Sequence, residues 1–239
     1  MFSTLLIAIC FSLGFFVESI VGFGGGIIAY SILAFFLDLK EMVLIGLYIG
    51  TCASAYICYT DIKSFDKKIF KSLIPASLIG TMLGVLIFSK FSSENLALGL
   101  GFLLILLSIK ILFFDKFIFP KVLKTKLIFL GGLAQGAFGT GGPFWVNAVV
   151  KDFKTKSSLR TTMAVTFVSF NLIRILQLLA QGQIRSDFFT QIWWVIIPVS
   201  ISIYAGYRVH LKVSENVVKK MIACLTVATG IKLFSKAFI

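Results

Sequence analysis

Gly22-Phe23-Gly24-Gly25-Gly26 lies in the middle of an apolar stretch and decides how the chain folds. Four glycines in five positions disfavour a regular helix, because each costs about 1 kcal/mol relative to alanine. The element recurs 117 residues later as Gly139-Thr140-Gly141-Gly142-Pro143. Open backbone at membrane depth persists only where protein surrounds it or where it lines a wet cavity. We therefore predict two helix breaks that face each other at mid-membrane depth.

The composition of the whole chain is that of a membrane protein. Hydrophobic residues make up 58% of the 239 residues, and the mean hydropathy is +0.99. A helix needs about 20 mostly apolar residues to cross a bilayer. Eight apolar runs of about this length or longer follow one another, at 1–37, 42–60, 69–89, 95–114, 127–150, 161–180, 188–207 and 217–239. The predicted fold class is an all-α polytopic membrane protein embedded in the lipid bilayer.

The charged residues and cysteines exclude several classes of function. The net charge of +13 does not indicate nucleic-acid binding, because the Lys and Arg residues lie in short connections between apolar runs. The four cysteines have no metal-ligand spacing, and the only histidine lies in a polar connection. No nucleophile–base pair is available within the apolar runs. We therefore expect no metal, no cofactor and no enzyme activity.

The two halves of the chain resemble each other. Gly14-x3-Glu18-x3-Gly22 matches Gly131-x3-Gln135-x3-Gly139. Further matches keep the same order in both halves: Pro75 and Pro198 before glycine-spaced runs, Ser93-Glu94-Asn95 and Ser214-Glu215-Asn216, and Ile109-Lys110 and Ile231-Lys232. A duplication is the simplest source of such a series. We predict two membrane repeats, 1–119 and 120–239, within one transmembrane domain.

The positions of the Lys and Arg residues distinguish two topologies. If all eight runs span, ten of these residues lie on each side, and the positive-inside rule gives no orientation. If 1–37 and 127–150 instead turn back at their glycine breaks, sixteen lie inside and four outside. The second arrangement obeys the rule and makes the halves inverted. Inverted repeats with broken helices at the midplane are typical of transporters.

Each glycine break has two interpretations. Small residues allow close packing between membrane helices, which is a purely structural role. Alternatively, each break exposes backbone N–H groups at the start of a new half-helix, where the helix dipole favours an anion. The second interpretation predicts substrate contacts from the residues of both breaks, namely Gly22, Gly24, Gly25, Gly26, Gly139, Thr140, Gly141 and Gly142.

Glu18 is the acid buried in the middle of an apolar run, one helical turn before the first break. Ionisable residues at such positions are expensive and are functional candidates by default. Gln135 is its neutral counterpart in the second half. Glu18 is either a proton carrier, with Gln135 as its partner position, or a structural partner for Arg174 or for backbone freed by the break. Both interpretations stay open at this point.

Arg174 lies within the run 161–180, with Asn171 and Gln177 on the same helical face. A guanidinium group pairs well with sulfonate, carboxylate or phosphate oxygens. Arg174 and Asn171 are therefore substrate-binding candidates, together with Asn147 near the second break. The alternative for Arg174 is snorkelling to the membrane interface.

The duplicated Gly-x-Gly-Gly-(Gly/Pro) element, in a chain with eight apolar runs and about 240 residues, resembles the TauE/SafE sulfite-exporter-like family. The resemblance covers the whole chain and is most specific at Gly22–Gly26 and Gly139–Pro143. It implies a multi-pass protein of the bacterial or archaeal inner membrane that transports sulfite, sulfonates or related organosulfur anions. Pro143 departs from the usual further glycine and removes one N–H donor there.

The leading hypothesis is a secondary transporter of a small anion that works by alternating access between the halves. With no ATP site in the sequence, an ion gradient must drive it, and proton coupling through Glu18 is a hypothesis. The alternatives are a passive anion channel, which needs a continuous polar path, and a carrier of a non-sulfur carboxylate or oxyanion. The sequence is compatible with a homo-oligomer and does not specify the transport direction.

Overall fold

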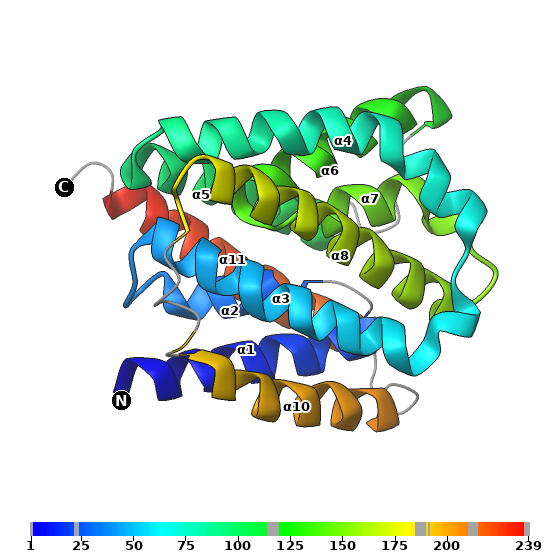
Figure 1. The fold of residues 1–239 in the computed structure, drawn as a ribbon, viewed down its shortest axis with the longest axis horizontal. Coiled ribbons are helices and arrows are strands. Elements are labelled where there is room, and N and C mark those ends of the chain that lie inside the picture. The colour runs from blue at the N-terminus through cyan, green and yellow to red at the C-terminus, as the bar shows by residue number, and fades with distance from the viewer. Residues whose placement is uncertain are drawn as a thin grey trace.

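The computed structural model describes residues 2–21, 24–113, 120–184, 190, 192–209 and 215–236, and within them it contains no strand (Figure 1). The predicted all-α class is confirmed. The α-helices are α1 (Phe2–Val21), α2 (Gly25–Leu33), α3 (Leu39–Asp61), α4 (Lys67–Lys90), α5 (Ser93–Phe113), α6 (Lys124–Phe138), α7 (Gly142–Val149), α8 (Lys156–Ala180), α10 (Ile196–Val209) and α11 (Glu215–Lys236).

The two runs that contain the glycine breaks, 1–37 and 127–150, each form two helical arms. The second arms, α2 and α7, have 9 and 8 residues, which is far too short to cross a bilayer. Each second arm folds back against its first arm. A Cβ atom placed on Gly14 of α1 would lie 2.2 Å from the carbonyl oxygen of Gly25 in α2. A Cβ atom on Gly141 would lie 2.3 Å from the carbonyl oxygen of Gly131 in α6.

Three further helices follow each hairpin, as predicted: α3, α4 and α5 in the first half, and α8, α10 and α11 in the second. The run 188–207 differs from the prediction. Trp193–Val195 form a 3₁₀ turn, and α10 begins only at Ile196. Residues 185–189 and 191 lie outside the described part of the chain.

The halves pack against each other in reciprocal pairs. Helix α4 of the first half packs on α6 of the second, and α10 of the second half packs on α1 of the first. Glycines permit both approaches: a Cβ atom on Gly84 would lie 2.3 Å from the carbonyl oxygen of Leu133, and one on Gly206 would lie 2.5 Å from that of Phe16. Helices α3 and α8 also pack together, as do α5 and α11. The inverted orientation of two repeats stays a prediction.

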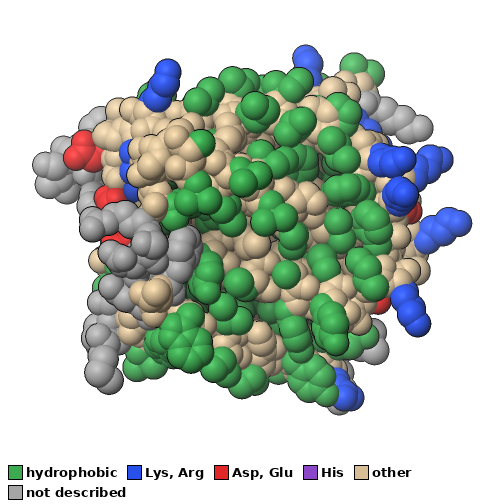
Figure 2. All heavy atoms as spheres, in the orientation of Figure 1, with side chains coloured by type: hydrophobic (Ala, Val, Ile, Leu, Met, Phe, Trp, Pro, Cys, Tyr) green, Lys and Arg blue, Asp and Glu red, His purple; other side chains and the backbone are tan. Residues whose placement is uncertain are grey.

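The outer surface suits a bilayer. Four described helices, α3 with its short extension and α4, α5 and α8, are long and apolar enough to cross a membrane. Apolar side chains on the outer faces are exposed at helical spacing, as at Leu172, Leu176 and Leu179 of α8. Figure 2 shows such side chains spread across one face. Lys and Arg side chains gather at one end of this view, where α3 ends and α8 begins (Figures 1 and 2).

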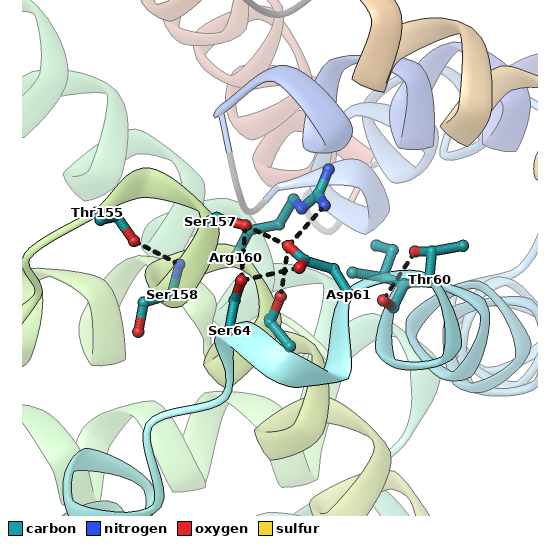
Figure 3. Close-up of polar contacts among 9 residues, drawn as sticks. Thr60, Asp61, Ser64, Thr155, Ser157, Ser158 and Arg160 are labelled. Atoms are coloured by element: carbon teal, nitrogen blue, oxygen red, sulfur yellow. Dashed lines mark hydrogen bonds and ion pairs between the residues drawn. The ribbon is translucent and has the colours of Figure 1, made fainter.

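A polar cluster joins α3 to α8 at this cationic end (Figure 3). The Asp61 carboxylate accepts hydrogen bonds from the hydroxyls of Ser64, Ser157 and Thr161. It also forms an ion pair with the Arg160 guanidinium at 3.3 Å. Further along the pair, Asn171 lies beside Gly50 of α3. Helices α3 and α8 are therefore antiparallel, and the cluster closes one end of the seam between them.

Candidate anion site at the paired glycine breaks

Both breaks require glycine for conformational reasons. Gly24, which precedes α2, has a φ of 100°, and Gly139, which follows α6, has a φ of 73°. L-amino acids with a side chain rarely adopt such values. Gly22, which was predicted to contact substrate, lies outside the described residues, as does Phe23. At Gly24 and Gly139, therefore, the backbone conformation itself requires glycine.

The two breaks meet inside the protein. A Cβ atom on Gly26 of the first break would lie 4.0 Å from the carbonyl oxygen of Gly139 in the second. A cavity of about 40 Å³ lies between them. Its walls come from α1, α2, α3, α6, α7 and α8. They are lined by Phe15, Glu18, Gly24, Gly26, Ile27, Tyr30, Gly46, Gly50, Ser54, Gln135, Gly139, Thr140, Gly142, Pro143, Phe167, Asn171 and Arg174.

Glu18 and Gln135 make matching hydrogen bonds at the two breaks. The backbone N–H of Gly25 donates to Glu18 Oε2 at 2.7 Å, and that of Gly141 donates to Gln135 Oε1 at 2.9 Å. Both side chains are buried, with exposed fractions of 6% and 1%. Each therefore satisfies a backbone donor freed by its break. These two N–H groups, which were predicted to face substrate, are occupied by the protein itself.

Arg174 places a cation in the wall of the cavity. Its side chain is 0% exposed, so it does not snorkel to an interface. Nε donates to the carbonyl oxygen of Gly136 at 3.1 Å, and Nη1 donates to Asn171 Oδ1 at 3.4 Å. No ion pair joins it to Glu18, although both residues line the cavity. Nη2 is buried and has no hydrogen-bond partner.

Other polar groups line the same cavity as this free nitrogen. Thr140 Oγ1 is buried without a partner at the second break. Asn171 Oδ1 also accepts a hydrogen bond from Gln135 Nε2 at 2.8 Å, which links α8 to α6. A buried guanidinium donor and a buried hydroxyl, both unsatisfied, are costly unless something else bonds them.

Tyr30 and Gly46 also shape the cavity, although neither was singled out from the sequence. The Tyr30 hydroxyl would lie 3.3 Å from a Cβ atom on Gly139, and a Cβ atom on Gly46 would collide with the phenol ring. Gly46 thus leaves room for Tyr30. The available signal was the spacing of Gly46 and Gly50, four residues apart in α3, since small residues at that spacing mark close approaches between membrane helices.

The predicted site residue Asn147 and the residue Gln177, which shares a helical face with Arg174, lie away from the cavity lining. Asn147 is half-buried, and its Nδ2 donates to the carbonyl oxygen of Pro143 in its own helix at 2.7 Å. Gln177 is half-buried, one turn beyond Arg174, and its Oε1 has no partner. Neither is among the residues that line the cavity. The structure thus brings together Glu18, Gln135, Arg174, Asn171 and the described cavity-lining residues of both breaks.

Within the described residues, no group of three His, Cys, Asp or Glu side chains could hold a metal ion. The cysteines are unpaired, and the buried Cys10 packs within the hydrophobic core. The side chains that line the cavity include one guanidinium, that of Arg174, one carboxyl group, that of Glu18, and several neutral hydrogen-bonding groups.

This architecture defines a class of protein: a polytopic helical membrane protein in which two broken helices enclose a buried polar cavity is built as a transporter. The chain belongs to the sulfite exporter TauE/SafE family, because the sequence model of that family matches residues 6–233, nearly the whole sequence. The resemblance found in the glycine breaks is thereby confirmed, and the chain is a membrane transport protein. No curated protein and no solved structure matched it.

Proposed function

We propose that this protein is a secondary transporter of a small sulfur oxyanion, such as sulfite or a short sulfonate, in the bacterial inner membrane. Its family implies a carrier of sulfite or related sulfur compounds. The observation that carries the proposal is Arg174, a fully buried guanidinium in the cavity wall with Nη2 unpartnered. Its planar fork matches the paired oxygens of a sulfonate or sulfite group.

The substrate lies between Arg174 and the second break. Arg174 Nη2 and Thr140 Oγ1, which lack partners within the protein, donate to its oxygens. Tyr30 and Phe167 line the same cavity and provide aromatic surface for an apolar substituent on sulfur. Charge-assisted bonds to Arg174 hold the oxyanion, and the aromatic residues favour an organic sulfonate over a strongly hydrated inorganic ion.

The arrangement of the halves supports alternating access over a channel. The cavity lies on the seam between α3 and α8, which belong to different halves, and the Asp61 cluster closes one end of that seam. A carrier opens such a seam at one end at a time, whereas a channel holds a continuous polar path. Proton coupling through Glu18 supplies the driving force, because Glu18 is the carboxyl group in this cavity.

Counterflow in proteoliposomes tests the proposal. Vesicles that contain the purified protein are loaded with unlabelled methanesulfonate and diluted into a trace of labelled methanesulfonate. A carrier accumulates the label transiently, whereas a channel does not. A carrier of carboxylates would instead exchange labelled acetate and leave methanesulfonate outside. Absence of counterflow with both sulfite and methanesulfonate would refute the proposed function, whether or not acetate exchanges.

A further inference from the structure

The cavity contains one fixed cation and one ionisable acid that do not neutralise each other by direct contact. Among the described lining residues, the ionisable side chains are those of Glu18, Tyr30 and Arg174. Glu18 bonds the N–H of Gly25, Arg174 bonds Gly136 and Asn171, and no ion pair joins them. With Tyr30 as a neutral phenol, the cavity carries no net charge when Glu18 is ionised and a single positive charge when it is protonated.

The helices around Glu18 add no further charge to this site. Helix α2 contributes Tyr30, α8 contributes Arg174, and α3, α6 and α7 contribute neutral lining residues. Helix α10, which packs against α1, carries Tyr204, Tyr207 and Arg208 on exposed positions outside the cavity. In the described part of α11, Lys232 donates to the carbonyl oxygen of Ala34 at 3.0 Å, away from the lining. The charge of the site therefore depends on Glu18.

We infer that the transporter carries one proton with each singly charged oxyanion, so that the loaded cavity is electrically neutral. This inference rests on the proposed function and specifies its substrate class and its energetics. An anion beside Arg174 leaves a net negative charge in a water-poor cavity if Glu18 is ionised, and none if Glu18 is protonated. Singly charged sulfonates and hydrogen sulfite satisfy this balance, whereas doubly charged sulfate does not.

The proposed coupling fixes how substrate affinity changes with pH. Because substrate binds together with a proton, the affinity for a monoanion falls as pH rises, by about tenfold per pH unit once Glu18 is ionised in the empty site. The cycle moves no net charge, so its rate is insensitive to membrane potential. Substrate accumulates on the alkaline side of the membrane, and with an alkaline interior net efflux occurs only when the outward substrate gradient exceeds the inward proton gradient.

The hydrogen bond at the second break shows which substitution of Glu18 preserves the shape of the first break. Gln135 makes with the Gly141 N–H the bond that Glu18 makes with the Gly25 N–H. An amide therefore fits this role, and Glu18→Gln keeps the acceptor oxygen while fixing the site in its neutral form. The reciprocal variant Gln135→Glu adds a second carboxyl group to the same cavity. The pair alters the charge of the site in opposite directions with little change in shape.

Proteoliposomes containing the full chain are assayed with labelled methanesulfonate and labelled sulfate, under a pH gradient alone or under a potassium-diffusion potential alone. For the wild-type protein we expect an acid-outside gradient to drive methanesulfonate accumulation of at least fivefold. The potential should change the rate less than twofold, and sulfate should not accumulate. Glu18→Gln should lose accumulation driven by the pH gradient, and its affinity for methanesulfonate should no longer fall as pH rises. Gln135→Glu should bind methanesulfonate at least tenfold more weakly at pH 8 than the wild type.

The outcomes separate this inference from the proposed function. Wild-type counterflow combined with potential-driven accumulation, or equal transport of sulfate and methanesulfonate, would overturn the inference and leave the transporter assignment intact. Accumulation by Glu18→Gln under a pH gradient would also overturn it. If Glu18→Gln does not fold, the pH and potential dependence of the wild type still decides the question. Absence of any counterflow by the folded wild type would overturn both.

Discussion

Replacement of Arg174 by methionine should separate substrate binding from folding. In the wild type, the buried guanidinium bonds Gly136 and Asn171 but forms no ion pair with a described carboxylate. Its removal loses two hydrogen bonds, each worth about 1.5–3 kcal/mol for a charged donor. It also removes the desolvation penalty of a buried ion, which is several kcal/mol. Because these effects oppose each other, the ligand-free variant should melt within a few degrees of the wild type.

Binding should respond much more strongly than folding. A charge-assisted hydrogen bond to the anion is worth about 1.5–3 kcal/mol, so that Arg174→Met weakens binding by about 10- to 150-fold. At a methanesulfonate concentration 100 times the wild-type Kd, the ligand stabilises the wild type by about 2.7 kcal/mol. Tenfold weaker binding reduces that stabilisation to about 1.4 kcal/mol, and 100-fold weaker binding to about 0.4 kcal/mol.

Thermal unfolding of the detergent-purified protein measures both effects in one titration. Arg174→Lys should recover part of the ligand-induced shift, because it keeps the charge and loses the planar fork. Arg208→Met is the matched control, since Arg208 is exposed and bonds the hydroxyl of Tyr204 on its own helix. It should leave both the melting temperature and the ligand shift unchanged. A full ligand-induced shift in Arg174→Met would refute the assignment of Arg174 to the site.

Two further predictions concern the framework that supports the cavity. Gly84→Ala should lower the free energy of unfolding by about 1–3 kcal/mol, because the new Cβ would lie 2.3 Å from a backbone oxygen of α6. The control Gly99→Ala should cost less in the same denaturation assay, because its Cβ would meet only the end of the Phe138 side chain, at 3.3 Å. Equal effects of the two variants would contradict this packing. Asp61→Ala should lower the free energy of unfolding by about 1–3 kcal/mol, because Arg160 and three hydroxyls lose the carboxylate that they bond. The control Asp152→Ala, which breaks a more exposed ion pair, should lower it by less than about 1 kcal/mol. The reverse order would show that the Asp61 cluster does not hold α3 to α8.

The sequence predicted the helix breaks and the residues next to them on the same helices. Clustered glycines disfavour regular helix by their local conformation, and Glu18 lies one turn before its break, so that both features depend on short-range geometry. Arg174 and Asn171 could be selected because polar residues inside an apolar run are costly. In each case a local rule was enough to identify the residue.

Contacts between distant helices were not predictable in this way. Tyr30 faces the cavity because Gly46 of α3 leaves room for its ring, and helical periodicity does not specify which helices are neighbours. Asn147 is close to the second break in sequence, yet it bonds its own helix. One interpretation left the backbone donors of Gly25 and Gly141 available to substrate, whereas another made Glu18 a partner of backbone freed by its break. In the structure, Glu18 and Gln135 accept hydrogen bonds from these two donors. These outcomes depend on tertiary packing.

A substrate-bound crystal structure would test most directly that the paired breaks and Arg174 form one anion site. Soaking with 2-bromoethanesulfonate provides a bromine atom that anomalous diffraction can locate. We predict one strong peak in the cavity, with the sulfonate oxygens within hydrogen-bond distance of Arg174 Nη2 and Thr140 Oγ1. An ordered ligand at another position, with this cavity unoccupied at saturating concentration, would contradict the account.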